Sequence, residues 1–212
     1  MGVQDRKARD FQRREADILA TALQLVKERD WQSITINEIA EGAEIGKGTI
    51  YIHFKRKEEV YARLVANRER QLFEQMERID PKLPLLARFK EVLRIYLLHE
   101  REYAENRGLE VFHQSMKSNP DPESPATQEY TQLEGAILNL IAGMLLEGVQ
   151  SGEFADKPIY HLGCSMWGAV IGSLSLLGKF PFQDMDVDEF MEDHLEFILK
   201  GLTNPESAPT GD

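Results

Sequence analysis

The sequence predicts an all-α protein, and three observations lead to that prediction. Apolar residues recur at helical spacing, and no run alternates strictly between apolar and polar. No Asn-Gly or Asp-Gly hairpin turn occurs. The nine prolines fall near positions where apolar helical patterns start or stop, and residues 1–80 contain none. About nine helices are expected, over residues 10–29, 35–42, 46–52, 57–79, 84–104, 107–117, 124–151, 158–179 and 187–201.

The composition of the 212-residue chain is that of a folded, acidic globular protein, with an apolar fraction of 42% and a net charge of −11. The single Cys164 excludes an internal disulfide and a multi-thiolate metal site. Residues 1–70 carry a net charge of +2 and residues 71–212 one of −13. Because salt screens charges beyond roughly 8 Å, local patches decide nucleic-acid binding, and the amino-terminal third can still bind DNA.

Neither export nor membrane insertion is expected. The first 30 residues lack an uninterrupted apolar block, so we expect no signal peptide and predict a cytoplasmic protein. Residues 158–178 form a stretch of 21 residues without a charge, long enough to cross a bilayer, but four glycines and several polar side chains dilute it. We therefore expect a buried, self-associating helix and no membrane contact.

The first expected helix has an apolar face and a basic start. Ile18, Ala22, Leu25 and Val26 recur at helical spacing and should face the core. Such a basic start is usually only a solvated face. Its basic side chains are Arg6, Lys7, Arg9, Arg13 and Arg14.

A helix-turn-helix is expected next. Thr35-Ile-Asn-Glu38 matches a capping box, in which the Thr35 side chain accepts from the Glu38 amide and the Glu38 side chain reaches back to the Thr35 amide. Gly42 and Glu44 bracket a turn, and Gly46-Lys-Gly-Thr-Ile-Tyr-Ile-His-Phe54 supplies a second short helix. Two short helices across a tight turn form a helix-turn-helix.

This segment carries a specific set of residues: Thr35, Ile39-Ala40, Ala43, Ile45-Gly46, Gly48-Thr49-Ile50-Tyr51, His53-Phe54, Lys57 and Glu58-Glu59-Val60. Together they resemble the DNA-binding segment of TetR-type transcriptional repressors, over about residues 10–65. A fainter similarity occurs at Leu146–Phe154, where many members end a long helix. Arg56 departs from the family pattern, which commonly has Ser, Asn, Gly or Asp at this helix-capping position. Either the fourth helix starts less cleanly or Arg56 contacts phosphate, and the register of Lys57 depends on which.

The predicted DNA contacts follow partly from geometry and partly from the resemblance. In a helix-turn-helix the second helix places its first turn against base edges, so Lys47 and Thr49 are the base-reading candidates, and Gly48 allows close backbone approach. The resemblance implies that phosphates are contacted by Thr35, Tyr51, His53 and Lys57. For Tyr51 the alternative to a phosphate contact is a half-buried ring packed on the first helix, and for His53 it is a structural role.

A homodimer is expected because specific DNA sites usually need two reading modules on one face of the duplex. The resemblance implies that the last two helices pair with their copies as a four-helix bundle. The alternative is that they only close their own core. The predicted interface residues are Cys164, Gly168, Ile171, Gly172, Ser175, Met191, His194, Leu195 and Ile198.

The resemblance also implies a small effector held between the helices of the larger domain. Aromatic and thioether side chains with scattered polar groups predict a largely apolar ligand, although such a stripe is core more often than pocket. The predicted effector-binding residues are Phe89, Tyr96, Tyr103, Phe112, His113, Met116, Tyr130 and Trp167.

The predicted organisation is a helix-turn-helix DNA-binding domain over residues 1–56, a helical effector-binding and dimerisation domain over 57–202, and a disordered tail over 203–212. The predicted function is that of a ligand-responsive repressor on a palindromic operator, with no cofactor, no metal and no enzymatic activity. One alternative is a DNA-binding activator. Another is a helical-bundle metal enzyme, since Glu110 and His113 have the spacing of half a di-iron site, but a second copy of that motif is missing.

Overall fold

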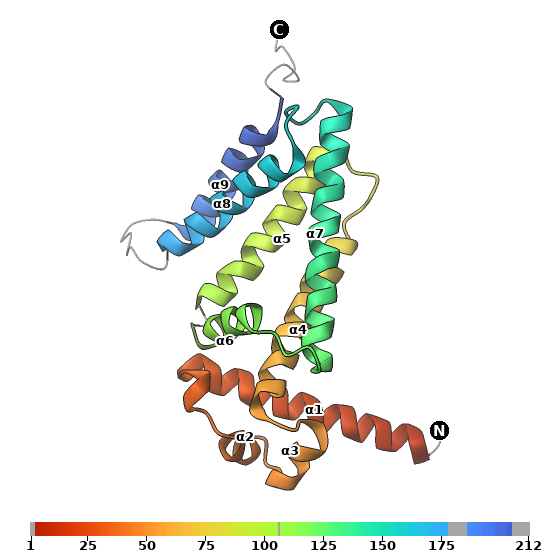
Figure 1. Cartoon of the computed structure of the whole chain (residues 1–212), viewed down its shortest axis with the longest axis vertical. Helices are drawn as coiled ribbons and strands as arrows, with labels where there is room; N and C mark the ends of the chain where they lie inside the picture. The colour runs from red at the N-terminus through yellow and green to blue at the C-terminus, as the bar shows by residue number, and fades with distance from the viewer. Residues whose placement is uncertain (1–2, 106, 178–185, 205–212) are drawn as a thin grey trace. The chain divides into compact units, whose positions relative to one another are not determined.

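The computed structural model describes residues 3–105, 107–177 and 186–204, and these are helical almost throughout (Figure 1). The described part contains no β-strand, only an isolated antiparallel bridge between Phe154 and Thr203. The all-α prediction is therefore confirmed. The elements are α1 (Val3–Glu28), a short 3-10 turn η1 (Trp31–Ser33), α2 (Ile36–Gly42), α3 (Lys47–His53), α4 (Lys57–Glu77), α5 (Leu85–Glu105), α6 (Arg107–Ser118), α7 (Pro125–Ser151), α8 (Ile159–Leu177) and α9 (Val187–Leu202).

The helix bounds from α2 onward lie close to the predicted ones, but α1 and η1 differ. Helix α1 begins at Val3 instead of about residue 10. The side chains of residues 5–14 are all exposed, so no apolar pattern marks this part of the helix. The turn η1 was not predicted because three residues are too few for a periodic pattern. It begins after Asp30, whose side chain accepts from the Gln32 amide at 3.0 Å.

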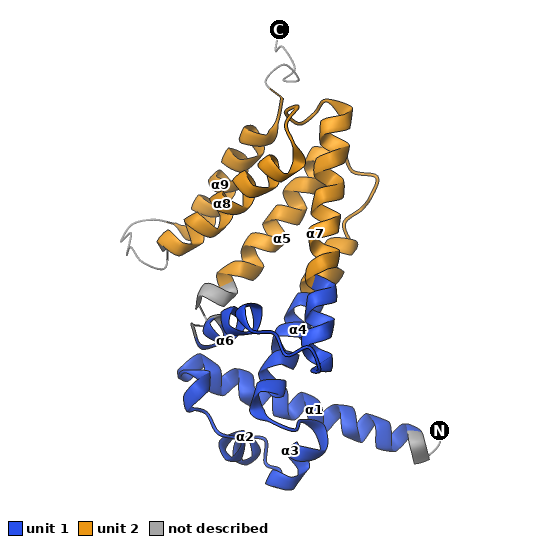
Figure 2. Ribbon diagram, viewed as in Figure 1, with its two compact units in different colours: residues 1–70, 106–133 blue, residues 71–105, 134–212 orange. Residues whose placement is uncertain are grey.

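The chain forms two compact units (Figure 2). Unit 1 comprises residues 1–70 and 106–133, and unit 2 comprises residues 71–105 and 134–212. Helices α4 and α7 contribute residues to both units. The predicted functional boundary after residue 56 does not coincide with this division by compactness, and it stays a prediction about function.

Unit 1 has a core of aliphatic and aromatic side chains. Ile39 of α2 and Ile50 of α3 are fully buried. An aromatic cluster joins η1, α4 and α6, with the Trp31 ring centroid 5.8 Å from that of Tyr61 and 4.9 Å from that of Phe112. Burial raises the pKa of the Tyr61 hydroxyl well above its usual value.

Helix α6 approaches the end of α1 so closely that only glycine fits between them. A Cβ atom at Gly108 would lie 2.8 Å from the carbonyl oxygen of Val26 and 3.0 Å from that of Arg29. Backbone cannot give way as a flexible side chain can, so a larger residue at position 108 would push the two helices apart.

Unit 2 holds an extended apolar core between α5, the second part of α7, α8 and α9. Phe89 of α5 is fully buried, and its ring centroid lies 5.2 Å from that of Phe154. At the rim of this core, Arg94 of α5 donates to both carboxylate oxygens of Glu192 of α9, at 2.8 and 2.9 Å. These hydrogen bonds lower the pKa of Glu192.

The chain after α9 is ordered further than predicted. The amide of Ala155 donates to the carbonyl oxygen of Leu202 at 2.8 Å, and the amide of Asn204 donates to that of Glu153 at 3.0 Å. Thr203 and Asn204 therefore belong to the folded unit, because Thr203 forms a bridge with Phe154 and the Asn204 amide pairs with the α7–α8 connection. The rest of the predicted disordered tail, residues 205–212, lies outside the described residues.

Helices α7 and α8 are long and apolar enough, by length and composition alone, to cross a membrane. Within the described residues α8 packs on α5 and α9, and α7 and α8 both supply residues to the unit 2 core. Only 28% of the apolar window of α7 and 22% of that of α8 are buried, so a single chain leaves apolar surface on both helices.

Candidate DNA-binding site and effector cavities

The amino-terminal end of α2 is held by the predicted capping box. The Thr35 hydroxyl accepts from the Glu38 amide at 3.3 Å and donates to the Glu38 carboxylate at 2.8 Å. The same carboxylate accepts from the Thr35 amide at 2.8 Å and from Arg29 at 2.6 Å. The hydrogen bonds from Arg29 and Thr35 lower the pKa of Glu38 to about 2. The Thr35 hydroxyl is thus engaged inside the protein, and its phosphate contact stays a prediction.

The turn between α2 and α3 is tight and contains one residue in the left-handed region. Glu44 has a φ of 54°, and it is the one non-glycine residue with positive φ in the described part of the chain. The Ile45 amide donates to the Ala40 carbonyl oxygen at 3.0 Å and closes the turn. Glycine would adopt this conformation more readily than glutamate.

Helix α3 presents its first turn to solvent and anchors itself through Ile50. Lys47 and Gly48 are exposed and Thr49 is half-buried, and nothing lies within 4 Å of a Cβ placed on Gly48. These three residues are therefore free to meet a macromolecule, as the prediction of base contacts requires. The base contacts themselves stay a prediction.

The rest of the outward face of α3 is amphipathic. The Tyr51 side chain is 49% exposed, so it is only partly packed. Ile52 is 70% exposed, and no role was predicted for it from the sequence. A large aliphatic side chain held in water beside base-reading candidates suits the apolar part of a major-groove contact.

His53 is half-buried at the end of α3. Its ring centroid lies 3.9 Å from that of Phe11 in α1, and its buried Nδ1 has no hydrogen-bond partner among the described residues. This placement supports a structural role for one side of the imidazole. The phosphate contact predicted for His53 stays a prediction and would fall to the other ring nitrogen.

Lys57 is placed differently from the expectation. Its ammonium donates to three backbone carbonyl oxygens, those of Trp31 at 3.2 Å, Gln32 at 2.8 Å and Ile34 at 2.9 Å. It also lies 5.1 Å from the centroid of the Trp31 ring. An ammonium has three donors, and all three are used here. A phosphate contact by Lys57 would require giving up at least one of these bonds.

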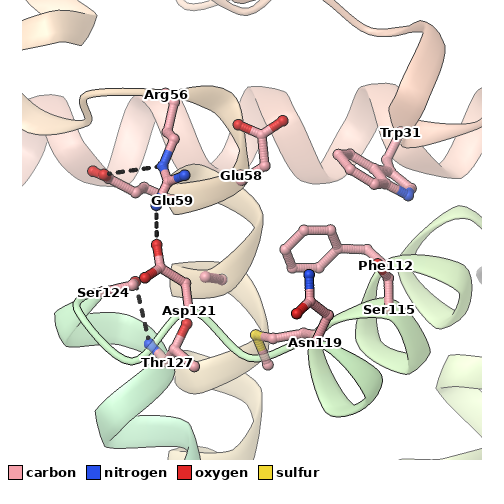
Figure 3. Close-up of a pocket in the computed structure, with 12 residues that line it drawn as sticks. Trp31, Arg56, Glu58, Glu59, Phe112, Ser115, Asn119, Asp121, Ser124 and Thr127 are labelled. Carbon is pink, nitrogen blue, oxygen red and sulfur yellow. Dashed lines mark hydrogen bonds and ion pairs between the residues drawn. The ribbon is translucent and has the colours of Figure 1, made fainter.

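Arg56 also finds its partners within the protein (Figure 3). Its guanidinium pairs with Asp121 and lies 3.6 Å from the Glu59 carboxylate. The Glu59 carboxylate in turn accepts from the Lys55 amide at 2.9 Å, which caps the start of α4 without a Ser or Asp at position 56. The structure thus favours an orderly helix start over a free Arg56 directed at phosphate.

The predicted effector-binding residues do not form one cavity. Phe112, His113, Met116 and Tyr130 belong to unit 1, and the side chain of Tyr103 lies outside the described residues. In unit 1, His113 and Tyr130 are buried with Nε2 3.1 Å from the phenol oxygen. Phe112 and Met116 line a hollow of about 220 Å³ together with polar side chains (Figure 3). Phe89, Tyr96 and Trp167 belong to unit 2, and so does the backbone of Tyr103.

Unit 2 contains a larger, more apolar hollow between α7 and α8. Its volume is about 600 Å³, within the roughly 300–1,000 Å³ range of ligand pockets. Trp167 lines it and packs on Tyr96 with ring centroids 4.3 Å apart, whereas Phe89 lies in the closed core. The other lining residues are Leu138, Asn139, Ile141, Ala142, Leu145, Ile159, Tyr160, Gly163 and Cys164, most of which sequence reasoning missed.

The predicted dimer-interface residues fall into two groups. On α8, Cys164, Gly168, Ile171, Gly172 and Ser175 are exposed and available to a partner. On α9, Met191, Leu195 and Ile198 are buried in the core of their own unit, so they cannot reach a partner directly. His194 is half-buried, with a ring nitrogen 3.2 Å from the Ala169 carbonyl oxygen, and burial lowers its pKa. The exposed face of α9 instead presents Phe197, which is 71% exposed.

Among the described residues no group of three or more His, Cys, Asp or Glu could hold a metal ion. The imidazole of His113 is engaged with Tyr130, and the side chain of Glu110 lies outside the described residues.

A capped helix, a tight turn and a second helix with an exposed polar first turn define a helix-turn-helix DNA-binding protein. Residues 18–64 match the family model described as "Bacterial regulatory proteins, tetR family". The fatty acid metabolism regulator protein of Bacillus subtilis (strain 168) is 26% identical over 88% of this chain and 94% of its own length.

Solved structures share the fold. FadR from Bacillus subtilis, in complex with stearoyl-CoA, has a TM-score of 0.67 at 23% identity, covering 88% of this chain and 98% of its own. The ketosteroid regulator KstR2 of Mycobacterium tuberculosis has a TM-score of 0.68 at 20% identity, covering 90% and 95%. The helix-turn-helix segment of this chain, residues 18–64, is thus that of the TetR family of bacterial regulatory proteins. By their names these relatives are regulators.

Proposed function

We propose that the protein is a cytoplasmic repressor that binds a palindromic operator as a homodimer and leaves it when a fatty acyl thioester binds. The observation that carries this proposal is the apolar hollow between α7 and α8 in a chain that also carries an exposed reading helix. The fatty acid metabolism regulator relative and the stearoyl-CoA complex of FadR support the choice of ligand class.

The homodimer is supported by the apolar surface that one chain leaves uncovered. Ile171 on α8 is 58% exposed and Phe197 on α9 is 71% exposed, and small residues on α8 allow close approach of another helix. Large apolar side chains left in water on these two helices favour a protein interface. We expect analytical ultracentrifugation to give twice the 24.3 kDa of one chain, and Phe197→Asp to shift the protein toward the monomer.

The effector would act through a two-state dimer, in which only one state matches successive major grooves. If the acyl thioester weakens DNA binding 10- to 100-fold, the coupling free energy is about 1.4–2.8 kcal/mol. Thermodynamic linkage then requires DNA to weaken effector binding by the same factor.

The experiment measures fluorescence anisotropy of a duplex that the wild-type protein selects from a random-sequence pool. Stearoyl-CoA should weaken binding 10- to 100-fold, whereas free coenzyme A should have no effect because it lacks the acyl chain. Ala142→Phe, which fills the α7–α8 hollow, should remove the response while leaving DNA affinity unchanged. Equal DNA affinities with and without stearoyl-CoA would contradict the proposed ligand.

The alternative to a repressor is a DNA-binding activator. The same titration separates the two, because an activator of this kind would bind its duplex more tightly with stearoyl-CoA present. In either case Lys47→Ala should change sequence preference, whereas His53→Ala should weaken binding to all duplexes alike.

A further inference from the structure

The amino-terminal part of α1 is a helix held out into solvent. The first buried side chain of α1 is Ile18, and residues 5–14 are all exposed. An exposed helical stretch of this length has marginal stability alone, so contacts along one of its faces should matter. One such contact exists, because the Phe11 ring packs against the ring of His53 at the end of α3, with ring centroids 3.9 Å apart. This contact fixes one face of α1 beside the reading helix.

That face carries two cations. Lys7 and Arg14 stand four residues before and three residues after Phe11, the spacing that places side chains on one face of a helix. Both are exposed, and Arg14 lines a surface hollow together with Asp17 of α1, Gly42 at the end of α2, and Ala43 and Glu44 of the following turn. The two positions lie about 10 Å apart along the helix axis. They therefore flank the contact between α1 and the reading helix.

We infer that Lys7 and Arg14 bind phosphates of the DNA strand beside the major groove that α3 occupies. The partner follows from charge complementarity, since both are cations on the side of α1 that contacts α3 and the turn before it, and the nucleic-acid backbone is the anion that α3 must approach. The inference rests on DNA binding by α3. It gives the basic start of α1 a role beyond that of a solvated face.

The chain offers a matched control on the same helix. Arg6 and Arg13 have the same spacing as Lys7 and Arg14, are equally exposed, and lie one position earlier, which is about 100° around the helix. Arg13 lies 3.5 Å from the Asp10 carboxylate on that other face. Removing either pair lowers the net charge by the same amount, so any difference between the pairs reports position and not charge.

The test compares Lys7→Gln/Arg14→Gln with Arg6→Gln/Arg13→Gln. The affinity for a duplex that the wild-type protein selects from a random pool is measured against salt concentration. The slope of log K against log salt should fall by about 0.9 for each lost phosphate contact, hence by about 1.8 per reading head, in the first pair only. Affinity at 0.1 M salt should drop at least about tenfold in that pair.

Thermal unfolding provides the second measurement and should be unchanged in both pairs, because all four side chains are exposed. Equal slope changes in the two pairs would mean that any cation on α1 attracts DNA to the same extent, and would overturn the inference. An unchanged slope in Lys7→Gln/Arg14→Gln would also overturn it. Failure of the wild-type protein to bind any duplex would instead refute DNA binding itself.

Discussion

The two units of the molecule are specified in different ways. The helix-turn-helix in unit 1 is built from short-range contacts, such as the Thr35–Glu38 capping box and the turn closed by Ile45. Unit 2 depends on contacts between helices far apart in the sequence, such as Arg94 with Glu192 and Phe89 with Phe154. Local signals can be recognised in one sequence, whereas long-range partners emerge only when the chain is folded. Four experiments test this difference between the two units.

The largest effect is expected in unit 2. Phe89→Ala should lower the free energy of unfolding by about 3–5 kcal/mol, because it removes a fully buried ring from the core. Leu98→Ala on the same helix should cost far less, since Leu98 is exposed. Urea denaturation measures both. Similar losses for the two variants would mean that Phe89 does not occupy the core.

Lys57 tests whether unit 1 also depends on a contact between residues that are distant in the sequence. Lys57→Met should lower the free energy of unfolding by about 1–3 kcal/mol, because three carbonyl oxygens lose a charged donor. Lys55→Met is the control, because Lys55 is exposed and its substitution removes the same positive charge. If Lys57→Met lowers the salt slope of DNA binding by about 0.9 without loss of stability, the phosphate role predicted from the sequence is correct instead.

The left-handed residue in the turn gives a smaller effect of opposite sign. Glu44→Gly should raise the free energy of unfolding by about 0.5–1 kcal/mol, because glycine adopts a φ of 54° without steric cost. Glu41→Gly, inside α2, should instead destabilise by about 1 kcal/mol. Thermal unfolding of the two variants should therefore shift in opposite directions, and a shared direction would contradict this account of the turn.

The smallest effect concerns the pH dependence of the capping box. The folded-state pKa of Glu38 is lowered from 4.5 to about 2, so its stabilising contribution is present above about pH 4.5 and is lost as the pH falls toward 2. NMR titration of the Glu38 carboxylate should give this low midpoint. Arg29→Gln should move it upward, because the strongest hydrogen bond is removed. A wild-type midpoint near 4.5 would exclude the network.

The sequence predicts most of the fold because helix boundaries are local. The capping box places the start of α2, and prolines mark the connections after residue 80. The early start of α1 could not be predicted, since its exposed residues have no apolar period. The turn η1 also has no apolar period, so it could not be predicted. Its three residues are held by Asp30 and by Lys57, which is distant in the sequence.

The candidate site was predictable only where residue type determines placement. Lys47, Gly48 and Thr49 are available on α3 because a short helix anchored by Ile50 must expose its other side. An apolar side chain can pack in the core, line a ligand cavity or face a partner subunit, so its residue type does not determine its placement. Met191, Leu195 and Ile198 of α9 turn into their own core, and the hollow between α7 and α8 is lined by ordinary aliphatic residues.

Gly108 carries a mechanical consequence. Where side chains separate two helices, a change of rotamer can absorb a small displacement of one of them. At Gly108 the main chain of α6 is in direct contact with the main chain at the end of α1. One of the carbonyl groups in this contact is that of Arg29, whose guanidinium donates to Glu38 at the start of α2. Helix α6 therefore cannot slide toward α1 without dragging the carboxyl-terminal turn of α1 with it.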